Sequence, residues 1–273
     1  MKVAFQGEPG AYSEAAIFEH YGRESQTLPC ESFDLVFESV SNGNADYGFL
    51  PIENSLAGSI HRNYDLLLQR DLTVVGEHHL HVHHCLITLH EASPSQLRRV
   101  ISHPQALAQC DGYLRSQNLK PEAVYDTAGS VKIMIEQGDI TLASIASRRA
   151  AELYGMHILA ENIEDNPLNF TRFLIVAREP LSISTNDTKT SIVFALKNEP
   201  GALFKALSVF ALRDIDLTKI ESPPLVGKPW EYFFYIDFAG STKEDKCHRA
   251  LEHLTEYATT LRILGSYPRH KQA

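Results

Sequence analysis

The chain has 273 residues, of which 44% are hydrophobic and 22% charged, so it can bury a large core and divide into two or three units. Its 25 basic and 34 acidic residues give a formal net charge of −9, which argues against a nucleic-acid partner and requires local cations for any anionic ligand. No stretch approaches the roughly 20 apolar residues of a membrane span, and the four cysteines are widely scattered. We therefore expect a cytoplasmic globular protein with reduced thiols and no membrane association.

Short apolar runs alternate with helical patterns over the first two-thirds of the chain. A strand at residues 3–5 precedes a turn at 7–10 and a helix that Ser13 can cap. Further strands are predicted at 47–52, 72–76, 82–89, 100–101, 124–126 and 142–143, and helices at 33–41, 60–69, 95–99, 105–116, 130–137 and 147–154. This alternation predicts an α/β fold with parallel strands, in which ligands bind at the carboxyl ends of the strands.

A polar, aperiodic segment at residues 178–189 is typical of an interdomain linker. Beyond it, strands are predicted at 191–196, 216–220, 232–238 and 261–264, and helices at 200–212 and 243–257. Their β-α-β-β-α-β order, in about 80 residues, predicts a separate ferredoxin-like module. Its polar turns contain no nucleophile matched to a base, so the pattern favours a binding or regulatory module.

Three polar segments lie where a predicted strand runs into a predicted helix. Residues 53–55 read Glu-Asn-Ser, residues 102–109 begin with Ser102 and end with Gln109, and residues 126–130 read Asp-Thr-Ala-Gly-Ser. Each segment alone fits simple helix capping. Helix N-termini also bind anions, and three such segments in one α/β unit would converge on one cleft.

Thr171 and Arg172 stand at the head of an apolar strand that extends to Ala177. The guanidinium group of Arg172 can receive a carboxylate through two hydrogen bonds. The alternative is that Arg172 pairs with an acid of purely structural role.

A run at residues 77–85 contains five histidines. In a strand, His79, His81 and His83 would share one face and offer three nitrogen ligands. No carboxylate or cysteine at established ligand spacing accompanies them, so a solvated strand face is the favoured interpretation. Nucleotide-binding and hydrolase motifs are also absent from the sequence, and we expect neither a metal nor a cofactor.

Taken together, these segments resemble the monofunctional prephenate dehydratases, which have the arogenate dehydratases as close relatives. The resemblance covers essentially the whole chain, through residues 6–13, 47–58, 102–110, 126–130 and the Thr-Arg-Phe motif at 171–173. It implies a catalytic domain of two α/β lobes, similar to a type 2 periplasmic binding protein, followed by an ACT domain. The expected boundaries are 1–180 for the catalytic domain, with its second lobe at about 76–165, then 181–189 for the linker and 190–273 for the ACT domain.

The resemblance also implies roles for individual residues. Catalysis falls on Thr171, Glu53 and Asn54, and substrate anchoring on Arg172. The other expected substrate-binding positions are Ser55, Ser102, Gln109, Thr127, Ala128, Gly129 and Ser130. The expected positions for the effector L-phenylalanine are Asn198, Gly201, Ala202, Leu203, Phe204, Glu221 and Ser222. The family's Glu-Ser-Arg-Pro motif is altered, because Pro223 stands in its third position.

The implied activity is that of a carbon–oxygen lyase. It converts prephenate to phenylpyruvate in phenylalanine biosynthesis, with loss of CO2 and water, and L-phenylalanine inhibits it. Thr171 can donate a hydrogen bond to the departing hydroxyl, while a neighbour, water or Glu53 supplies the proton; the sequence leaves this choice open.

Two alternatives also remain open. One is an arogenate dehydratase or an enzyme of dual specificity, and the other is a non-catalytic amino-acid sensor, against which the intact motifs at Glu53 and Thr171 argue. The apolar strand at 231–238, in a sheet with one uncovered face or edge, and the resemblance together predict a homodimer or a homotetramer.

Overall fold

The computed structural model describes residues 1–183, 185, 187–222 and 232–270. Its contacts form two units, one of residues 1–60 with 78–173 and one of residues 61–77 with 174–273. This division differs from the expected boundaries, because helix α3 (His61–Gln69) and the first half of strand β5 (Thr73–His81) group with the C-terminal residues. Pro223, which alters the expected effector motif, lies outside the described residues.

The first lobe is built on a sheet with strand order β2-β1-β3-β11-β5, to which β4 adds by pairing with β3. Besides β5, this sheet contains β1 (Lys2–Gln6), β2 (Gln26–Cys30), β3 (Tyr47–Asn54), β4 (Gly58–Ser59) and β11 (Phe170–Ala177). Strand β1 runs parallel to both β2 and β3 and buries its apolar centre completely. Helices α1 (Tyr12–Tyr21) and α2 (Phe33–Ser41) follow β1 and β2, so they begin at the carboxyl ends of those strands.

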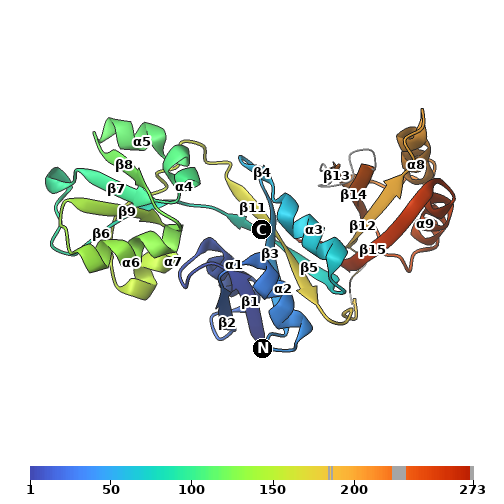
Figure 1. Cartoon of the computed structure of the whole chain (residues 1–273), viewed down its shortest axis with the longest axis horizontal. Helices are drawn as coiled ribbons and strands as arrows, with labels where there is room; N and C mark the ends of the chain where they lie inside the picture. The colour runs from blue at the N-terminus through green and yellow to red at the C-terminus, as the bar shows by residue number, and fades with distance from the viewer. Residues whose placement is uncertain (184, 186, 223–231, 271–273) are drawn as a thin grey trace. The chain divides into compact units, whose positions relative to one another are not determined.

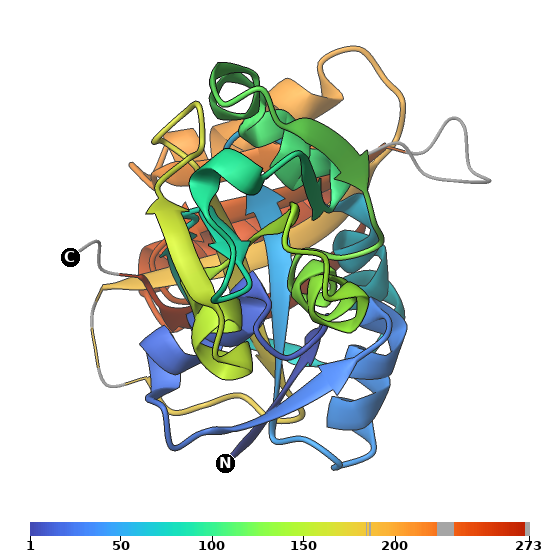
Figure 2. The ribbon, with the colours of Figure 1, turned by 90° about the vertical axis from the view of Figure 1, so that its left-hand side faces the viewer.

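The second lobe has its own sheet, with strand order β10-β6-β9-β7-β8 (Figure 1). The strands are β6 (Cys85–Thr88), β7 (Arg99–Ser102), β8 (Lys120–Ala123), β9 (Leu142–Ala146) and β10 (His157–Glu161). The helices are η1 (Pro94–Gln96), α4 (Pro104–Gln109), α5 (Asp111–Ser116), α6 (Thr127–Gln137) and α7 (Arg148–Tyr154). Figure 2 views this lobe from its outer side. All five residues of β9 are buried, as a central strand covered on both faces requires.

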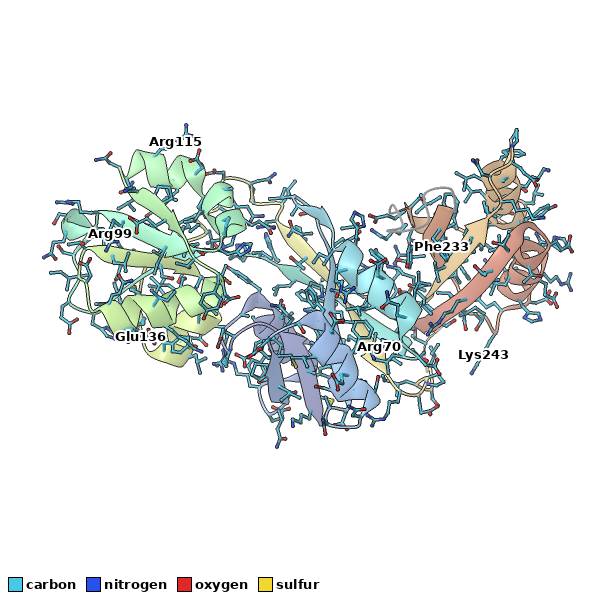
Figure 3. The ribbon with its side chains drawn as sticks, in the orientation of Figure 1. Arg70, Arg99, Arg115, Glu136, Phe233 and Lys243 are labelled. Atoms are coloured by element: carbon cyan, nitrogen blue, oxygen red, sulfur yellow. The ribbon has the colours of Figure 1, made fainter. Side chains whose placement is uncertain are left out.

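The outer surface of this lobe carries charged side chains (Figure 3). Arg99 of β7 pairs with Glu122 at 2.9 Å and with Asp139 at 3.0 Å, whereas Arg115 and Glu136 are exposed on α5 and α6. The interior is apolar, since Leu107 and Leu114 pack with Val100 and Ile145.

The two lobes touch where the turn before α1 meets the start of α7. Ser147 Oγ donates to the carbonyl oxygen of Gly10 at 2.5 Å, and Arg149 Nε donates to Glu14 at 3.1 Å. Gly10 has φ +92°, and a Cβ atom there would lie 2.9 Å from the Cα atom of Ala150. Only glycine fits this contact, because any larger residue would be strained and would push the lobes apart.

The C-terminal unit contains a four-stranded antiparallel sheet with strand order β13-β14-β12-β15. Its elements are β12 (Thr188–Leu196), α8 (Ala202–Ala211), β13 (Leu217–Glu221), β14 (Tyr232–Ala239), α9 (Asp245–Tyr257) and β15 (Ala258–Pro268). The fully buried side chains of Phe194, Phe210, Phe238 and Leu254 form its core. The predicted β-α-β-β-α-β order is confirmed, and so is the α/β class of the two lobes.

Several details of the predicted elements were wrong. Both sheets of the first two-thirds are mixed rather than parallel, since β4 pairs antiparallel with β3, and β6 with β9 and β10. The helix expected at 105–116 breaks at Cys110, and the strand expected at 124–126 lies at Lys120–Ala123. The sequence patterns missed β2 and β10, which are half-exposed edge strands and therefore lack a clear apolar alternation.

Among the described residues, no helix combines the length and the apolar character that crossing a membrane requires.

Candidate active site

A cavity of about 420 Å³ lies between the two lobes of the first unit. Most of the polar residues that line it come from the carboxyl ends of strands or from the helices that follow them, whereas Thr171 is near the start of β11 and His84 lies between β5 and β6. They are Gln6, Tyr12, Ser13, Asn54, His84, His103, Gln105, Gln109, Asp126, Thr127 and Thr171. Each of the three segments expected to converge at strand ends contributes a residue to the lining, namely Asn54, Gln109 and Thr127.

The starts of α1, α2 and α6 all reach this cavity, through Tyr12, Phe33 and Thr127. The first N–H groups of a helix have no acceptor within the helix, and the helix dipole places partial positive charge there. Three helix starts around one cavity therefore favour an anionic ligand. This arrangement supplies the local positive potential that an acidic protein needs in order to bind an anion.

The hydroxyl group of Thr171 is oriented by the side chain of Asn54. Asn54 Oδ1 accepts from the backbone N–H groups of Leu56 at 3.1 Å and Ala57 at 3.0 Å, which fixes the direction of the amide. Asn54 Nδ2 consequently faces Thr171 and donates to its Oγ1 atom at 3.0 Å. Because Thr171 Oγ1 accepts this bond, its own hydrogen remains available to donate into the cavity.

A second amide and a glutamine extend this arrangement. Asn54 Nδ2 also donates to Asn169 Oδ1 at 2.8 Å, and Asn169 Nδ2 donates to Gln109 Oε1 at 3.2 Å. Gln109 Oε1 lies 2.8 Å from His84 Nε2, and His84 Nδ1 lies 2.6 Å from the hydroxyl of Tyr12. A continuous series of hydrogen bonds therefore joins Tyr12 to Thr171 along the wall of the cavity.

The titratable members of this series are neutral at neutral pH. Burial lowers the pKa of His84, and hydrogen bonding to Gln109 and the nearby Glu164 carboxylate only partly offset that effect. Burial also raises the pKa of Tyr12 well above its usual value. Thus neither side chain brings a net charge into the cleft.

Arg172, expected to anchor the substrate, and Glu53, one of the groups that could supply the proton, do not line the cavity. Side chains alternate along a strand, so Thr171 and Phe173 face the cavity while Arg172 points to the other side of the sheet. The side chain of Arg172 is 8% exposed, and its Nη1 atom lies 3.9 Å from Glu53 Oε1. The geometry therefore favours the alternative raised for Arg172, a pairing with an acid.

The three serines among the other expected substrate-binding residues use their hydroxyl groups in hydrogen bonds within the protein. Ser55 Oγ donates to the carbonyl oxygen of Leu168 at 2.7 Å. Ser102 and Ser130 are fully buried and donate to the carbonyl oxygens of Ile145 and Thr127 at 2.6 Å and 2.5 Å.

The segment expected to be a polar loop at 126–130 is the start of a helix instead. Asp126 caps α6 by accepting from the N–H of Gly129 at 2.7 Å. Ala128, Gly129 and Ser130 turn into the core of the lobe, and Thr127 lines the cavity. The substrate-binding set that this geometry supports is therefore smaller than the set expected from the sequence.

Tyr12, His84 and Asn169 have no substrate role in the expectations drawn from the sequence. Signals for all three were present, because Tyr12 and Asn169 adjoin the family motifs and His84 belongs to the histidine run. The run does not form one face, since β5 ends at His81. His81 Nε2 lies 2.6 Å from the carbonyl oxygen of Pro167, and His83 Nδ1 lies 2.9 Å from Glu164. Within the described residues, no group of three ligating side chains is arranged to hold a metal ion.

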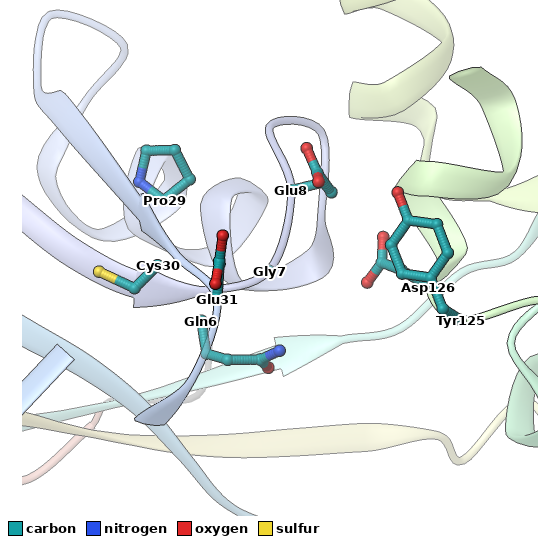
Figure 4. A pocket seen from close by; sticks show the side chains of 8 residues that line it. All are labelled: Gln6, Gly7, Glu8, Pro29, Cys30, Glu31, Tyr125 and Asp126. Carbon is teal, nitrogen blue, oxygen red and sulfur yellow. The ribbon is translucent and has the colours of Figure 1, made fainter. Parts of the chain in front are cut away.

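A second cavity, of about 380 Å³, adjoins the first and shares Gln6 and Asp126 with it. Figure 4 shows Glu8, Glu31, Tyr125 and Asp126 around it. Lys132 forms an ion pair with Glu8. Because Lys132 already neutralises Glu8, Glu31 and Asp126 supply the remaining negative charge around this cavity, which favours a cationic group.

The C-terminal unit holds a separate cavity of about 200 Å³ at the start of α8. Its lining includes the expected effector positions Asn198, Ala202 and Leu203, together with Leu196, Lys197, Glu199 and Phe234. The other expected effector positions do not line it. Gly201 precedes α8 with φ +80°, Phe204 is 77% exposed, Glu221 pairs with Lys219 at 2.9 Å, and Ser222 is exposed.

Comparison with known proteins identifies the relatives of this chain. The family model for prephenate dehydratase matches residues 3–181. Arogenate dehydratase/prephenate dehydratase 2 of Arabidopsis thaliana, a chloroplastic protein, is 51% identical over 278 residues, which cover 98% of this chain and 73% of the relative.

Two of the solved structures that resemble the whole chain have TM-scores of 0.90 or more. Prephenate dehydratase from Arthrobacter aurescens in complex with L-Phe has a TM-score of 0.90 and 32% identity, with 98% of this chain and 90% of that chain covered. A structure described as GqqA, a novel type of quorum quenching acylases, has a TM-score of 0.92 and 36% identity, with 99% and 98% covered. The resemblance drawn from the sequence motifs is confirmed, and the chain belongs to the prephenate dehydratase family.

Proposed function

We propose that the protein converts prephenate to phenylpyruvate. The observation that supports this most directly is the hydroxyl of Thr171, which accepts from Asn54 and can donate into a cavity surrounded by helix N-termini. Prephenate carries two carboxylates and a ring hydroxyl. In the reaction the bond from the ring carbon to the hydroxyl oxygen breaks, and so does the bond from the ring to its carboxylate. The electron pair of the second bond enters the ring, which becomes aromatic, and CO2 leaves. The departing hydroxyl oxygen takes a proton from solvent water in the open cavity and leaves as water.

Different lining residues have different roles in this reaction. Thr171 donates a hydrogen bond to the hydroxyl oxygen as negative charge develops there, and stabilisation of such charge is a large catalytic term. The N–H groups at the starts of α1, α2 and α6 and the amide of Gln109 bind the carboxylates. Thr127, at the start of α6, adds a hydroxyl donor. Glu53 places a negative charge beside the buried guanidinium group of Arg172, with Oε1 and Nη1 3.9 Å apart.

Product formation by the purified protein tests this proposal. Prephenate and arogenate are supplied separately, each with and without L-phenylalanine. Phenylpyruvate formed from prephenate supports the proposed function. Turnover of arogenate alone makes the protein an arogenate dehydratase, and turnover of neither substrate supports the non-catalytic sensor.

Arogenate is the second candidate substrate, and two observations favour it. The Arabidopsis and Petunia hybrida relatives carry arogenate dehydratase in their names. Arogenate has an ammonium group where prephenate has a ketone. Besides Glu8, which pairs with Lys132, the cavity beside the cleft has two carboxylates that can receive this ammonium, those of Glu31 and Asp126. Asp126 is the one that borders both cavities.

We predict that Asp126→Asn lowers kcat/KM for arogenate about tenfold, equivalent to about 1.4 kcal/mol, and leaves kcat/KM for prephenate unchanged. Asparagine retains the oxygen that caps α6, so the change removes the charge and keeps the helix start. Steady-state kinetics with both substrates measure the effect, and Glu136→Gln on the exposed side of the same helix is the control. Equal losses for the two substrates would contradict a role in discrimination.

Acyl transfer has less support from the cleft, although a structural relative is described as a quorum quenching acylase. Acyl transfer by a hydroxyl nucleophile needs a base within hydrogen-bond distance of that hydroxyl. In the described cleft, His84 contacts Tyr12 and Gln109, and Thr171 contacts Asn54. An assay with an acyl-homoserine lactone tests the alternative directly.

We propose that the C-terminal unit is an ACT domain whose small cavity binds L-phenylalanine and thereby reduces activity. The A. aurescens relative was solved with L-Phe, and the cavity at the start of α8 has the mixed polar and apolar lining that an aromatic amino acid requires.

Filling that cavity should abolish regulation. We predict that Ala202→Leu raises the L-phenylalanine concentration for half-maximal inhibition at least about tenfold and leaves uninhibited kcat unchanged, because the added side chain occupies the ligand's volume. Inhibition curves measure the shift. Ala211→Leu, the same substitution at the exposed end of the same helix, serves as the control. Inhibition of the Ala202→Leu variant at the wild-type concentration would place the effector elsewhere.

We propose further that the protein is a homodimer or a homotetramer. Association would cover several exposed apolar side chains. They are Leu203 and Phe204 on α8, Leu212 directly after it, and Ile220 and Ile263 on the sheet. Light scattering measures the mass of the assembly in solution.

A cytoplasmic location is proposed as well, with the chloroplast as the alternative that the names of the Arabidopsis relatives suggest. Cell fractionation distinguishes the two locations.

A further inference from the structure

The direction of each hydrogen bond between Tyr12 and Thr171 follows from the two backbone N–H groups that bind Asn54. Those donors make Asn54 Oδ1 an acceptor, so Nδ2 is the donor to Asn169 Oδ1. With its oxygen used in this way, Asn169 presents Nδ2 to Gln109. Gln109 Oε1 is then an acceptor, and the amide NH2 of Gln109 is left as the donor that this lining residue offers to a ligand.

His84 completes this series with one possible tautomer. A carbonyl oxygen only accepts, so the 2.8 Å contact between His84 Nε2 and Gln109 Oε1 requires a hydrogen on Nε2. In the neutral ring Nδ1 is then the acceptor, and it receives the hydroxyl hydrogen of Tyr12 at 2.6 Å. The backbone N–H of His84 donates to Glu164 at 2.9 Å, which fixes the ring's attachment point as well.

Gln109 Oε1 accepts two hydrogen bonds, and the shorter one comes from His84. The contact from His84 is 2.8 Å and that from Asn169 is 3.2 Å. Without the imidazole donor, the Gln109 amide can rotate and present its oxygen to the cavity, where it would repel a carboxylate. Asn169 is fully buried, so its Nδ2 group would then lose its acceptor with no solvent to replace it.

We propose that His84, in its Nε2–H form and oriented by Tyr12, is a positioning residue that holds the Gln109 amide with its donor toward the substrate. Through Asn169 and Asn54 it also supports the direction of the Thr171 hydroxyl. This inference rests on the proposed dehydratase function. It assigns His84 neither proton transfer nor metal binding, because both ring nitrogens are occupied by side chains of the protein.

Three substitutions of His84 separate positioning from packing. His84→Gln keeps a donor near the Nε2 position, His84→Asn keeps a polar group only near the Nδ1 position, and His84→Met keeps volume without a donor. We expect kcat to fall on the order of 10²-fold for His84→Met and His84→Asn, since a misplaced active-site group costs about that much. For His84→Gln we expect kcat within about fivefold of wild type. His90→Gln is the matched control, because His90 Nε2 also contacts a carbonyl oxygen, that of Gly155 at 2.6 Å, outside the cleft.

Equal kcat losses in the glutamine and methionine variants, or losses that follow the melting temperature of each variant, would overturn the proposal. A second measurement does not depend on activity or on the folding of variants. Nitrogen-15 NMR of histidine-labelled wild-type protein should show a neutral His84 with its hydrogen on Nε2, and a hydrogen on Nδ1 alone would overturn the proposal. If the protein turns over neither prephenate nor arogenate, the proposed function fails while the NMR result still decides the tautomer.

Discussion

Thr171→Ala should lower kcat on the order of 10²-fold to 10³-fold, the usual cost of removing one donor aimed at developing negative charge. The substrate's carboxylates contact other groups, so KM should change by less than about threefold. Alanine removes the hydroxyl that Asn54 orients and leaves the partly exposed strand end otherwise intact. Steady-state kinetics with prephenate measure both parameters.

Thr171→Ser is the control for this result, because serine retains the hydroxyl and the hydrogen bond from Asn54. Its kcat should stay within about tenfold of wild type, since the lost methyl group only loosens the rotamer. If kcat falls equally in the alanine and serine variants, the hydroxyl is not the group that matters. If KM rises as much as kcat falls in the alanine variant, Thr171 binds the ground state instead.

Asn54→Asp should reduce kcat by about 10²-fold to 10³-fold, because it removes the amide donor that binds Thr171 Oγ1, Asn169 Oδ1 and the carbonyl oxygen of Phe170. One carboxylate oxygen can still accept from the N–H groups of Leu56 and Ala57, so the turn keeps its shape. The other oxygen replaces the amide donor and must accept from Thr171, whose hydrogen then points away from the cavity. The added negative charge also disfavours an anionic substrate in the cleft.

The melting temperature and circular dichroism of this variant establish that the loss is local. Asn166→Asp is its matched control, since Asn166 Oδ1 accepts from the backbone N–H of Leu168 at 2.9 Å in a similar turn and does not line the cavity. Near-wild-type kcat for Asn54→Asp would mean that the direction of the Thr171 hydroxyl does not depend on Asn54.

The sequence predicted most of the central elements and part of the cleft. Asn54, Gln109 and Thr127 could be named because they follow strands, and the carboxyl ends of strands in an α/β lobe meet at one place. Thr171 stands at the head of its strand and was named from the Thr-Arg-Phe motif instead. The two-residue period of strand β11 shows why Arg172 was misplaced. Once Thr171 and Phe173 face the cavity, the residue between them cannot.

Burial was the property that sequence reasoning could not supply. Ser102 and Ser130 have the same residue type and the same place at a strand or helix end as residues that line a cleft, yet both are fully buried and donate to carbonyl oxygens. His84 shows the converse. Its neighbours Tyr12 and Gln109 are 72 and 25 residues away in sequence, so only the folded lobes bring the three side chains together.

The short turn after β3 has a consequence for which changes the protein can tolerate. The direction of the Asn54 amide comes from the N–H groups of Leu56 and Ala57, both exposed residues whose side chains take no part in the contact. Both positions should therefore tolerate nearly every amino acid except proline, which has no N–H group. The number of residues in the turn is not free, since an insertion or deletion would move both donors away from Asn54. The residue types in this surface turn can therefore vary. Its length must stay constant, because the orientation of the Thr171 hydroxyl group depends on it.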